Sequence, residues 1–210
     1  MKKTISTMQA WLTVLFVSCF LVSNVLAAKQ FQLPFGITMT GAVLVFPITY
    51  ILSDVFSEVY GYRWSRITCY MAFAMNLLMV GFFSLAIAAP AATYWDGQEA
   101  FRCVLGSAPR VLAASLAAYV VGDFANDKVF ATMKKRHDGT SGFGVRAILS
   151  SLAGEACDSC IFIPLAFAGQ MPVRSLVTMG ITQILIKVGY ECLILPITAT
   201  IARRLSAIER

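Results

Sequence analysis

ITCYMAFAMNLLMVGFFSLAIAA, residues 67–89, is a run of apolar and small residues without a single charge. An α-helix rises about 1.5 Å per residue, so roughly 20 apolar residues cross the hydrocarbon core of a bilayer. We therefore predict that this stretch forms a transmembrane helix. The whole chain is similarly apolar, because 58% of its 210 residues are hydrophobic and 13% are charged. Soluble domains carry about 25% charged residues, so this composition predicts a protein whose solvent is largely lipid.

Five further stretches are long and apolar enough to span a bilayer. Together they predict an all-α membrane protein with one domain over residues 1–210, in which six helices form a compact bundle. The predicted spans are residues 8–28, 37–60, 67–89, 108–133, 145–168 and 175–201. The first of them follows two lysines and also resembles a cleavable signal peptide. We interpret it as a retained helix and keep cleavage as the alternative.

Basic residues lie mostly between the predicted spans, and they predict the orientation of the chain. With the N-terminus in the cytoplasm, the inner segments hold Lys2, Lys3, Arg63, Arg66, Lys134, Lys135, Arg136, Arg146, Arg203, Arg204 and Arg210. The outer side then holds Lys29, Arg102, Arg110 and Arg174. Lys and Arg accumulate in cytoplasmic loops, so both termini are predicted to be cytoplasmic. No basic face is interleaved with aromatic residues, and we expect no binding of nucleic acid despite the net charge of +6.

Ionisable residues inside the predicted spans are the main functional signal. Each costs about 2.5–3.5 kcal/mol on insertion scales, and such residues usually mark a path for a solute or an ion. Four spans each carry a pair three or four residues apart, which places both members on one helix face. The pairs are Asp54 with Glu58, Asp123 with Asp127, Glu155 with Asp158, and Lys187 with Glu191. This pattern predicts a polar cavity between the second, fourth, fifth and sixth spans.

The depth of these residues separates two groups. Transporters usually bind substrates near the midplane, where Glu155, Asp158, Lys187 and Glu191 are predicted to lie. A single lysine cannot neutralise three carboxylates, so at least one acid should be protonated or face a polar ligand. The other four acids fall in the inner third of their spans. Among them, Asp54 and Asp123 are assigned to substrate binding, and Glu58 and Asp127 to a cytoplasmic vestibule or to coupling.

Structural roles compete with these assignments. Lys187 and Glu191 could form a buried ion pair that only locks two helices together. Glu58, Asp127 and Lys128 could extend to interfacial water. Tyr50, Tyr119 and Tyr190 flank the charges and could stack on a flat heterocycle or simply pack between helices.

Signals for an enzyme are sparse. The chain has one histidine, His137, so neither a zinc triad nor a Ser–His pair can be built within the membrane. It also lacks a Walker motif. We therefore expect no metal, no cofactor and no catalytic residue. Cys157-x-x-Cys160 supports the alternative of a membrane thiol oxidoreductase, but both cysteines lie among apolar residues and are interpreted as packing residues.

Several short motifs together resemble the vitamin uptake transporter family, whose members are queuosine precursor transporters. They are Phe46-Pro-Ile-Thr-Tyr50 with Asp54 and Glu58, Trp95 with Gln98, Val104-Leu-Gly106, Gly122-Asp123-Phe124 with Asn126, Gly154-Glu155, Asp158-Ser159, Gln183, Lys187 and Tyr190-Glu191. Asp127, Cys157 and Cys160 fall outside the pattern. The resemblance implies a multi-pass transporter of the cell inner membrane. It implies import, for salvage, of 7-deazaguanine compounds such as preQ0, preQ1 or queuine.

The resemblance also sharpens the roles of the candidate residues. A guanine-like edge offers an N–H and an exocyclic amine to Glu155 or Glu191 as charge-assisted hydrogen bonds. Asp158 or Asp54 would receive an aminomethyl cation, and Lys187 would contact the ring carbonyl or hold Glu191. Asp123, Asn126 and the three tyrosines complete the predicted purine-like binding site. A homodimer stays open, and the rival function is a substrate-binding subunit that needs a separate ATP-driven module.

Overall fold

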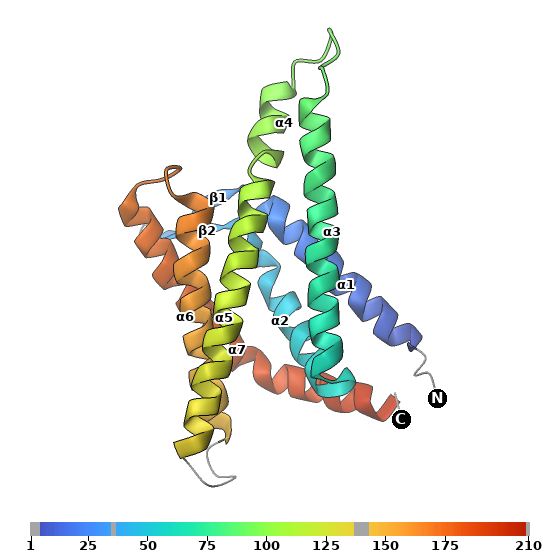
Figure 1. The fold of residues 1–210 in the computed structure, drawn as a ribbon, viewed down its shortest axis with the longest axis vertical. Helices are drawn as coiled ribbons and strands as arrows, with labels where there is room; N and C mark the ends of the chain where they lie inside the picture. Colours follow the sequence, from blue (N-terminus) through green and yellow to red (C-terminus); the bar gives the residue numbers. More distant parts are fainter. Residues whose placement is uncertain (1–4, 35–36, 137–142, 209–210) are drawn as a thin grey trace. The chain divides into compact units, whose positions relative to one another are not determined.

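The computed structural model describes residues 5–34, 37–136 and 143–208, and most of them are helical (Figure 1). The α-helices are α1 (Thr7–Leu26), α2 (Phe46–Val55), α3 (Tyr62–Ala88), α4 (Gln98–Leu105), α5 (Ala108–Arg136), α6 (Phe143–Phe167) and α7 (Val173–Ile208). The shorter elements are strands β1 (Gln30–Gln32) and β2 (Thr38–Thr40), a 3₁₀ turn over Gly41–Leu44 and a π-helical turn over Phe56–Tyr60. His137 lies outside the described residues.

Four helices among the described residues are long and apolar enough to cross a membrane. They are Thr7–Leu26, which is α1, Tyr62–Ala88, which is α3, Gln98–Asn126, which runs from α4 into α5, and Leu149–Phe167, which is the greater part of α6. The uncharged run that begins at Ile67 forms most of the second of these helices. An all-α membrane protein with several spans is thus confirmed, while the number six, the compact bundle and the cytoplasmic termini stay predictions.

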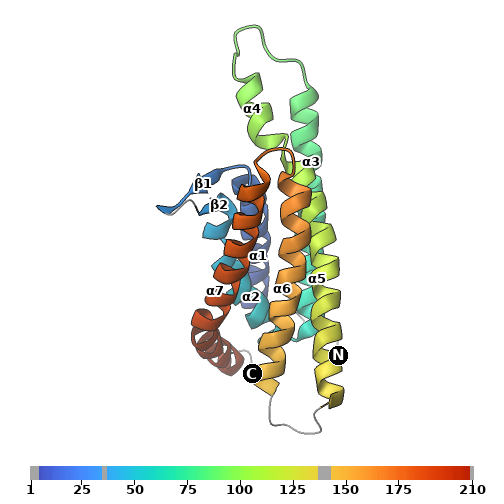
Figure 2. The same ribbon diagram turned by 90° about the vertical axis from the view of Figure 1, so that its left-hand side faces the viewer.

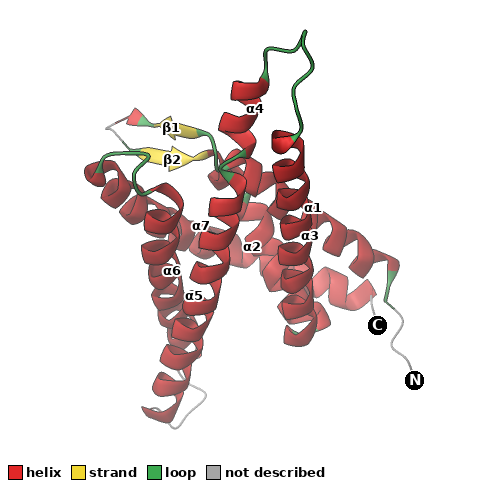
Figure 3. Cartoon of the chain, turned by 45° about the horizontal axis from the view of Figure 1, so that its top comes forward, coloured by secondary structure: helices red, strands yellow, loops and turns green. Residues whose placement is uncertain are grey.

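The predicted helix over residues 37–60 is wrong in its first part. Residues 38–40 form strand β2, which pairs with β1 in a two-stranded sheet, drawn as yellow arrows in Figure 3. The β-branched Thr38 and Thr40 favour an extended backbone. Gly41 then passes so close to α1 that a Cβ atom there would lie 2.7 Å from the carbonyl oxygen of Leu26. Helix α2 begins only at Phe46, with Pro47 in its first turn, where proline costs no hydrogen bond.

Helix α4 was not predicted, because its eight residues are too few for a span and are mixed in polarity. Gln98 donates a side-chain hydrogen bond to the backbone oxygen of Ile87 at 2.9 Å, which ties the start of α4 to the end of α3. Trp95 packs edge-on against Phe101 with ring centroids 6.0 Å apart. These contacts order a segment that the sequence predicts to be a loop.

The described chain groups into two compact units, which are treated separately. The first holds Met1–Phe31, Thr40–Leu112 and Tyr190–Arg210, and the second holds Gln32–Met39 and Ala113–Gly189. In the first unit, α1 packs against α3 and α2. Phe16 meets Phe56 edge-on with centroids 5.9 Å apart, and Asn24 donates a buried hydrogen bond to Asn76 at 2.7 Å. An amide pair of this kind links transmembrane helices because lipid offers no competing partner.

The second unit contains most of α5, all of α6 and the first half of α7. Its apolar core includes Ala114, Ile163, Phe167 and Met179, each at most 2% exposed. Figure 2 shows α5 and α6 running side by side, and they approach each other closely at two glycines. A Cβ atom on Gly154 would lie 3.0 Å from the carbonyl oxygen of Gly122. The helix backbones therefore touch, as small residues allow in membranes.

The glycine contact gives a stability prediction. Gly154→Val should lower the thermal unfolding midpoint of the purified protein, because the added methyl groups must push α6 away from α5 at a cost of about 1–3 kcal/mol. Gly81→Val is the matched control, since nothing lies within 4 Å of a Cβ atom at Gly81 in helix α3. Equal midpoints for the two variants, measured by scanning fluorimetry in detergent, would contradict the close packing of α5 on α6.

Candidate functional site

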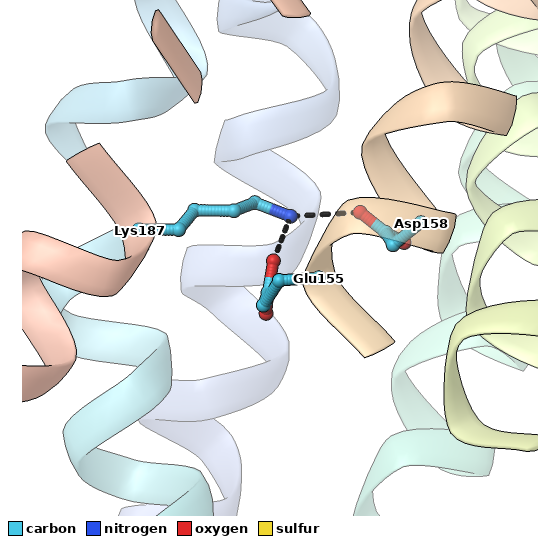
Figure 4. A network of polar contacts seen from close by, with 3 residues as sticks. All are labelled: Glu155, Asp158 and Lys187. Carbon is cyan, nitrogen blue, oxygen red and sulfur yellow. Dashed lines mark hydrogen bonds and ion pairs between the residues drawn. The ribbon is translucent and has the colours of Figure 1, made fainter. Parts of the chain in front are cut away.

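Three charged side chains meet between α6 and α7. The ammonium nitrogen Nζ of Lys187 lies 2.6 Å from Oε2 of Glu155 and 2.7 Å from Oδ2 of Asp158 (Figure 4). Lys187 donates a hydrogen bond to Asp158, and its contact with Glu155 is an ion pair. The side chains of Lys187, Glu155 and Asp158 are 10%, 24% and 28% exposed. We call these three residues the charged triad.

Helix geometry explains why the triad forms. Glu155 and Asp158 are three residues apart on α6 and share one face. Helices α6 and α7 are antiparallel neighbours, and Ile163 lies in one apolar cluster with Met179. Stepping back about two turns from Ile163 along α6 reaches Glu155, and stepping forward about two turns from Met179 along α7 reaches Lys187. The register of the apolar core therefore aligns the opposite charges.

A polar layer lies between the apolar core and the triad. Ser159 on α6 and Gln183 on α7 are 1% and 3% exposed, and the same antiparallel register places them at one level. The hydroxyl oxygen of Ser159 has no hydrogen-bond partner among the described residues. A buried polar atom without a partner costs about 1–3 kcal/mol, so this hydroxyl group is free to bind a ligand or a water molecule. Both residues belong to the motifs of the family resemblance, but neither was predicted to be a site residue.

The signal that could have found the polar layer is helix spacing. Ser159 follows Glu155 by four residues, and Gln183 precedes Lys187 by four, so each shares a helix face with a triad member. Charged residues are conspicuous in a predicted span because of their insertion cost. Uncharged polar residues are common enough in transmembrane helices to pass unnoticed.

The triad can bind both hydrogen-bond donors and acceptors. Its carboxylates accept hydrogen bonds and the ammonium group donates them, within a mostly buried and weakly screened environment. With all three groups ionised, the triad carries one net negative charge. Among the described residues, no cluster of His, Cys, Asp and Glu is arranged to hold a metal ion.

The structure brings part of the predicted site together around the triad. Asn126 on α5 lies at the glycine contact, since a Cβ atom on Gly154 would be 3.0 Å from its own Cβ. It therefore sits on the side of α5 that faces α6, beside the residue that precedes Glu155. Tyr119 and Asp123 are half-buried on the same helix. Their assignment to the binding site stays a prediction.

The remaining predicted residues belong to the first unit or have side chains outside the described ones. Asp54 on α2 and Glu58 in the π-helical turn belong to the first unit and are exposed, and Tyr190 is half-buried in that unit. The side chains of Tyr50, Asp127 and Glu191 lie outside the described ones. The convergence of the four pairs of ionisable residues on one polar cavity stays a prediction. The role of Glu58 and Asp127 in a vestibule or in coupling also stays a prediction.

Lys187 has two ion-pair partners on the neighbouring helix. Its ammonium nitrogen lies within 2.7 Å of two carboxylates of α6. The sequence left open whether Lys187 pairs with Glu191, four residues further along α7. The side chain of Glu191 lies outside the described ones, so that pairing stays a prediction.

Comparison with known proteins identifies the family. Residues 40–201 match the family described as "Putative vitamin uptake transporter". This chain belongs to that family. The resemblance found in the sequence is thereby confirmed, and the chain is a multi-pass membrane transporter. The matched range includes the charged triad, the polar layer and the glycine contact.

A curated relative is also named as a transporter. The chain is 24% identical over 174 residues to a protein of Bacillus subtilis (strain 168) named "Probable queuosine precursor transporter". The aligned part covers 83% of this chain and 76% of that relative. No solved structure matches the chain.

The triad gives a second stability prediction. Lys187→Met should destabilise the protein by roughly 3 kcal/mol, because removing one partner of a buried ion pair leaves charge uncompensated. Lys128→Met is the control, since Lys128 is exposed and lies over the ring of Phe124. Adding Asp158→Asn to Lys187→Met should recover part of the lost stability by removing one of the stranded carboxylates.

The measurement is the midpoint of thermal unfolding for the four proteins in one detergent. A Lys187→Met protein as stable as the wild type would show that the triad does not hold α6 and α7 together.

Proposed function

We propose that this transporter imports 7-deazaguanine compounds, the precursors of queuosine, across the cell inner membrane for salvage. Family membership and the curated relative's name support the substrate class. The observation that carries the proposal is the pair formed by Glu155 and Lys187, with 2.6 Å between Oε2 and Nζ. A carboxylate beside an ammonium group is complementary to the polar edge of a guanine ring.

The chemistry of that edge explains the complementarity. A 7-deazaguanine presents an exocyclic amine and a ring N–H side by side, followed by the ring carbonyl. Glu155 would accept hydrogen bonds from the two N–H groups in a bidentate arrangement, and Lys187 would donate to the carbonyl oxygen. Each contact involves an ionised group in a weakly screened site, where such bonds are stronger than in water.

The neighbouring polar layer fits the same ligand. Ser159 and Gln183 offer a hydroxyl and an amide about one turn from the ion pair, and both are almost fully buried. A site that must hydrogen-bond its substrate rejects analogues that lack the matching groups, because its own polar atoms are then left unpaired. Stacking of the flat ring on Tyr119, Tyr50 or Tyr190 and contacts from Asn126 and Asp123 complete the proposed site.

The chain is proposed to act as a carrier by itself. The rival is a substrate-binding subunit that requires an ATP-driven module. Purified protein reconstituted alone into liposomes distinguishes them, since a carrier admits labelled 7-aminomethyl-7-deazaguanine without partners. Proton coupling and facilitated diffusion both remain compatible with this scheme. An imposed pH gradient in the same liposomes separates them, because only coupled transport accumulates the solute above its outside concentration.

Glu155→Gln tests the proposed recognition. The amide keeps the size of the side chain but replaces one acceptor oxygen by a donor, so it cannot accept both N–H groups. The loss of about 1.5–3 kcal/mol expected for hydrogen bonds to a charged group corresponds to about a 10- to 100-fold fall in uptake at low substrate.

Glu99→Gln is the matched control, because Glu99 is an exposed residue of α4 whose side chain is 84% accessible. Uptake is measured in cells that cannot synthesise the precursor, with tRNA modification as the readout and membrane protein quantified by immunoblot. Normal uptake by Glu155→Gln at normal expression would remove Glu155 from the site.

A further inference from the structure

We propose that helix α7 bends at Gly189 during the transport cycle, and that this glycine is a hinge of the transporter. The inference goes beyond the proposed function, because a carrier of any solute must change conformation to open its site to each side of the membrane in turn. Hinges are a few backbone positions, often small residues, that absorb such a change.

Helix α7 passes from one compact unit to the other. It runs without interruption over Val173–Ile208, yet the second unit ends at Gly189 and the last segment of the first unit begins at Tyr190. Gly189 thus lies in the interior of a long helix, where each backbone N–H group donates to a carbonyl group of the preceding turn. A movement of one unit alone must therefore bend α7 near this point.

The other places where the chain changes unit need no such hinge. Helix α5 changes unit between Leu112 and Ala113, close to its first residue Ala108. The first N–H groups of a helix have no partner within the helix, so its first turns are held less firmly than its interior. The remaining changes of unit lie in the short strands β1 and β2.

Gly189 has no packing role among the described residues. Outside its own stretch of helix, no described atom lies within 4 Å of a Cβ atom built at this position. Gly122 and Gly154 differ, because a Cβ atom on either of them would lie 3.0 Å from an atom of the neighbouring helix. Glycine is the least favourable residue of a helix interior after proline. A glycine that packing does not require is explained by the backbone freedom that it gives.

The part of α7 that precedes Gly189 is held by α6. Lys187, two residues before the hinge, lies 2.6 Å from a carboxylate oxygen of Glu155 and 2.7 Å from one of Asp158. The residues before the hinge therefore stay with α6, and those from Tyr190 onward follow the first unit. Bending at Gly189 leaves the contacts of the charged triad intact.

The other residues that weaken α7 as a helix do not mark the boundary. Gly180 lies within the second unit, where a Cβ atom would contact Ile163 at 3.7 Å. Pro196 has no N–H group to donate to the preceding turn, but it lies within the segment Tyr190–Arg210 of the first unit. Gly189 alone among the three stands where the units meet along the helix.

The test replaces Gly189 by residues that stiffen the helix. Alanine is the best helix former, and serine lies between alanine and glycine. The rate at which reconstituted liposomes take up labelled 7-aminomethyl-7-deazaguanine should fall in the order glycine, serine, alanine. We expect about a fivefold loss for Gly189→Ala, the factor that corresponds to the roughly 1 kcal/mol by which alanine favours the helical backbone over glycine.

The thermal unfolding midpoint should change in the opposite direction to the rate. It should rise from glycine to serine to alanine, by about 2–4 °C for alanine. A residue with a purely structural role would not lose activity as the protein gains stability.

Gly81→Ala is the matched control. Gly81 also lies in the interior of a helix without a described atom within 4 Å of a Cβ atom, and all of α3 belongs to the first unit. This variant should gain similar stability and keep the wild-type rate of uptake per molecule of reconstituted protein.

Hydrogen exchange tests the hinge without a substrate. The N–H groups of residues 190–193 donate to the carbonyl groups of residues 186–189 in a regular helix, and these bonds must open when α7 bends. Mass spectrometry of the purified protein should show that Gly189→Ala slows the exchange of these N–H groups about fivefold. Gly81→Ala should leave their exchange unchanged.

The outcomes separate the hinge from the proposed substrate. Uptake by Gly189→Ala at the wild-type rate would overturn the hinge, and so would an equal loss in Gly81→Ala. If the wild-type protein does not take up the deazaguanine, the proposed substrate fails and the exchange experiment decides the hinge. Unchanged exchange of residues 190–193 in Gly189→Ala would then overturn it, and slower exchange would support it.

Discussion

An ammonium group shared by two carboxylates is the interaction on which the rest of this structure depends. The desolvation penalty for a buried ion amounts to several kcal/mol, and lipid supplies nothing to offset it. The cost is offset here because the ammonium nitrogen of Lys187 lies 2.6 Å from a carboxylate oxygen of Glu155 and 2.7 Å from one of Asp158. Distances this short demand an accurate register between α6 and α7. The apolar cluster around Ile163 and Met179 sets the register, and the glycine contact holds α6 against α5.

The same interaction suits a transport site. Lys187 compensates the carboxylates when no ligand is bound, so the empty site does not expose two uncompensated charges to the membrane. A ligand with donors and acceptors in the matching order can replace these internal contacts by equivalent external ones. Exchange of partners of this kind keeps the difference in free energy between the empty and occupied states small. A carrier needs that balance, because it must release the substrate as readily as it binds it.

The sequence predicts the helices well where apolar length alone decides the structure, as at residues 67–89. It fails at residues 37–45, where a largely apolar stretch with two threonines contains a strand and a close approach of Gly41 to α1. Hydropathy cannot separate a helix from a strand in such a run, because both bury the same side chains. Helix α4 was missed for the opposite reason. Its order comes from Gln98, whose partner Ile87 lies in α3, and from Trp95, which precedes α4 and packs against Phe101.

The charged part of the candidate site could be predicted from the sequence, and the reason is physical. Charges in a membrane helix are costly, so Glu155, Asp158 and Lys187 stood out without any structure. Their pairing could not be derived, because spacing along α7 offered Glu191 as an equally good partner for Lys187. Only the packing of two helices identifies the partners across them. Ser159 and Gln183 belong to the motifs of the family resemblance but were not assigned to the site, because their burial is not visible in the sequence and only their four-residue spacing from Glu155 and Lys187 marks them.

The most direct test of the account is an experimental structure of the protein with 7-aminomethyl-7-deazaguanine bound in a lipid nanodisc. We expect the two N–H groups of the ligand edge to lie on Glu155 and the ring carbonyl on Lys187. A ligand bound elsewhere, with Lys187 still paired to both carboxylates, would contradict the proposed recognition.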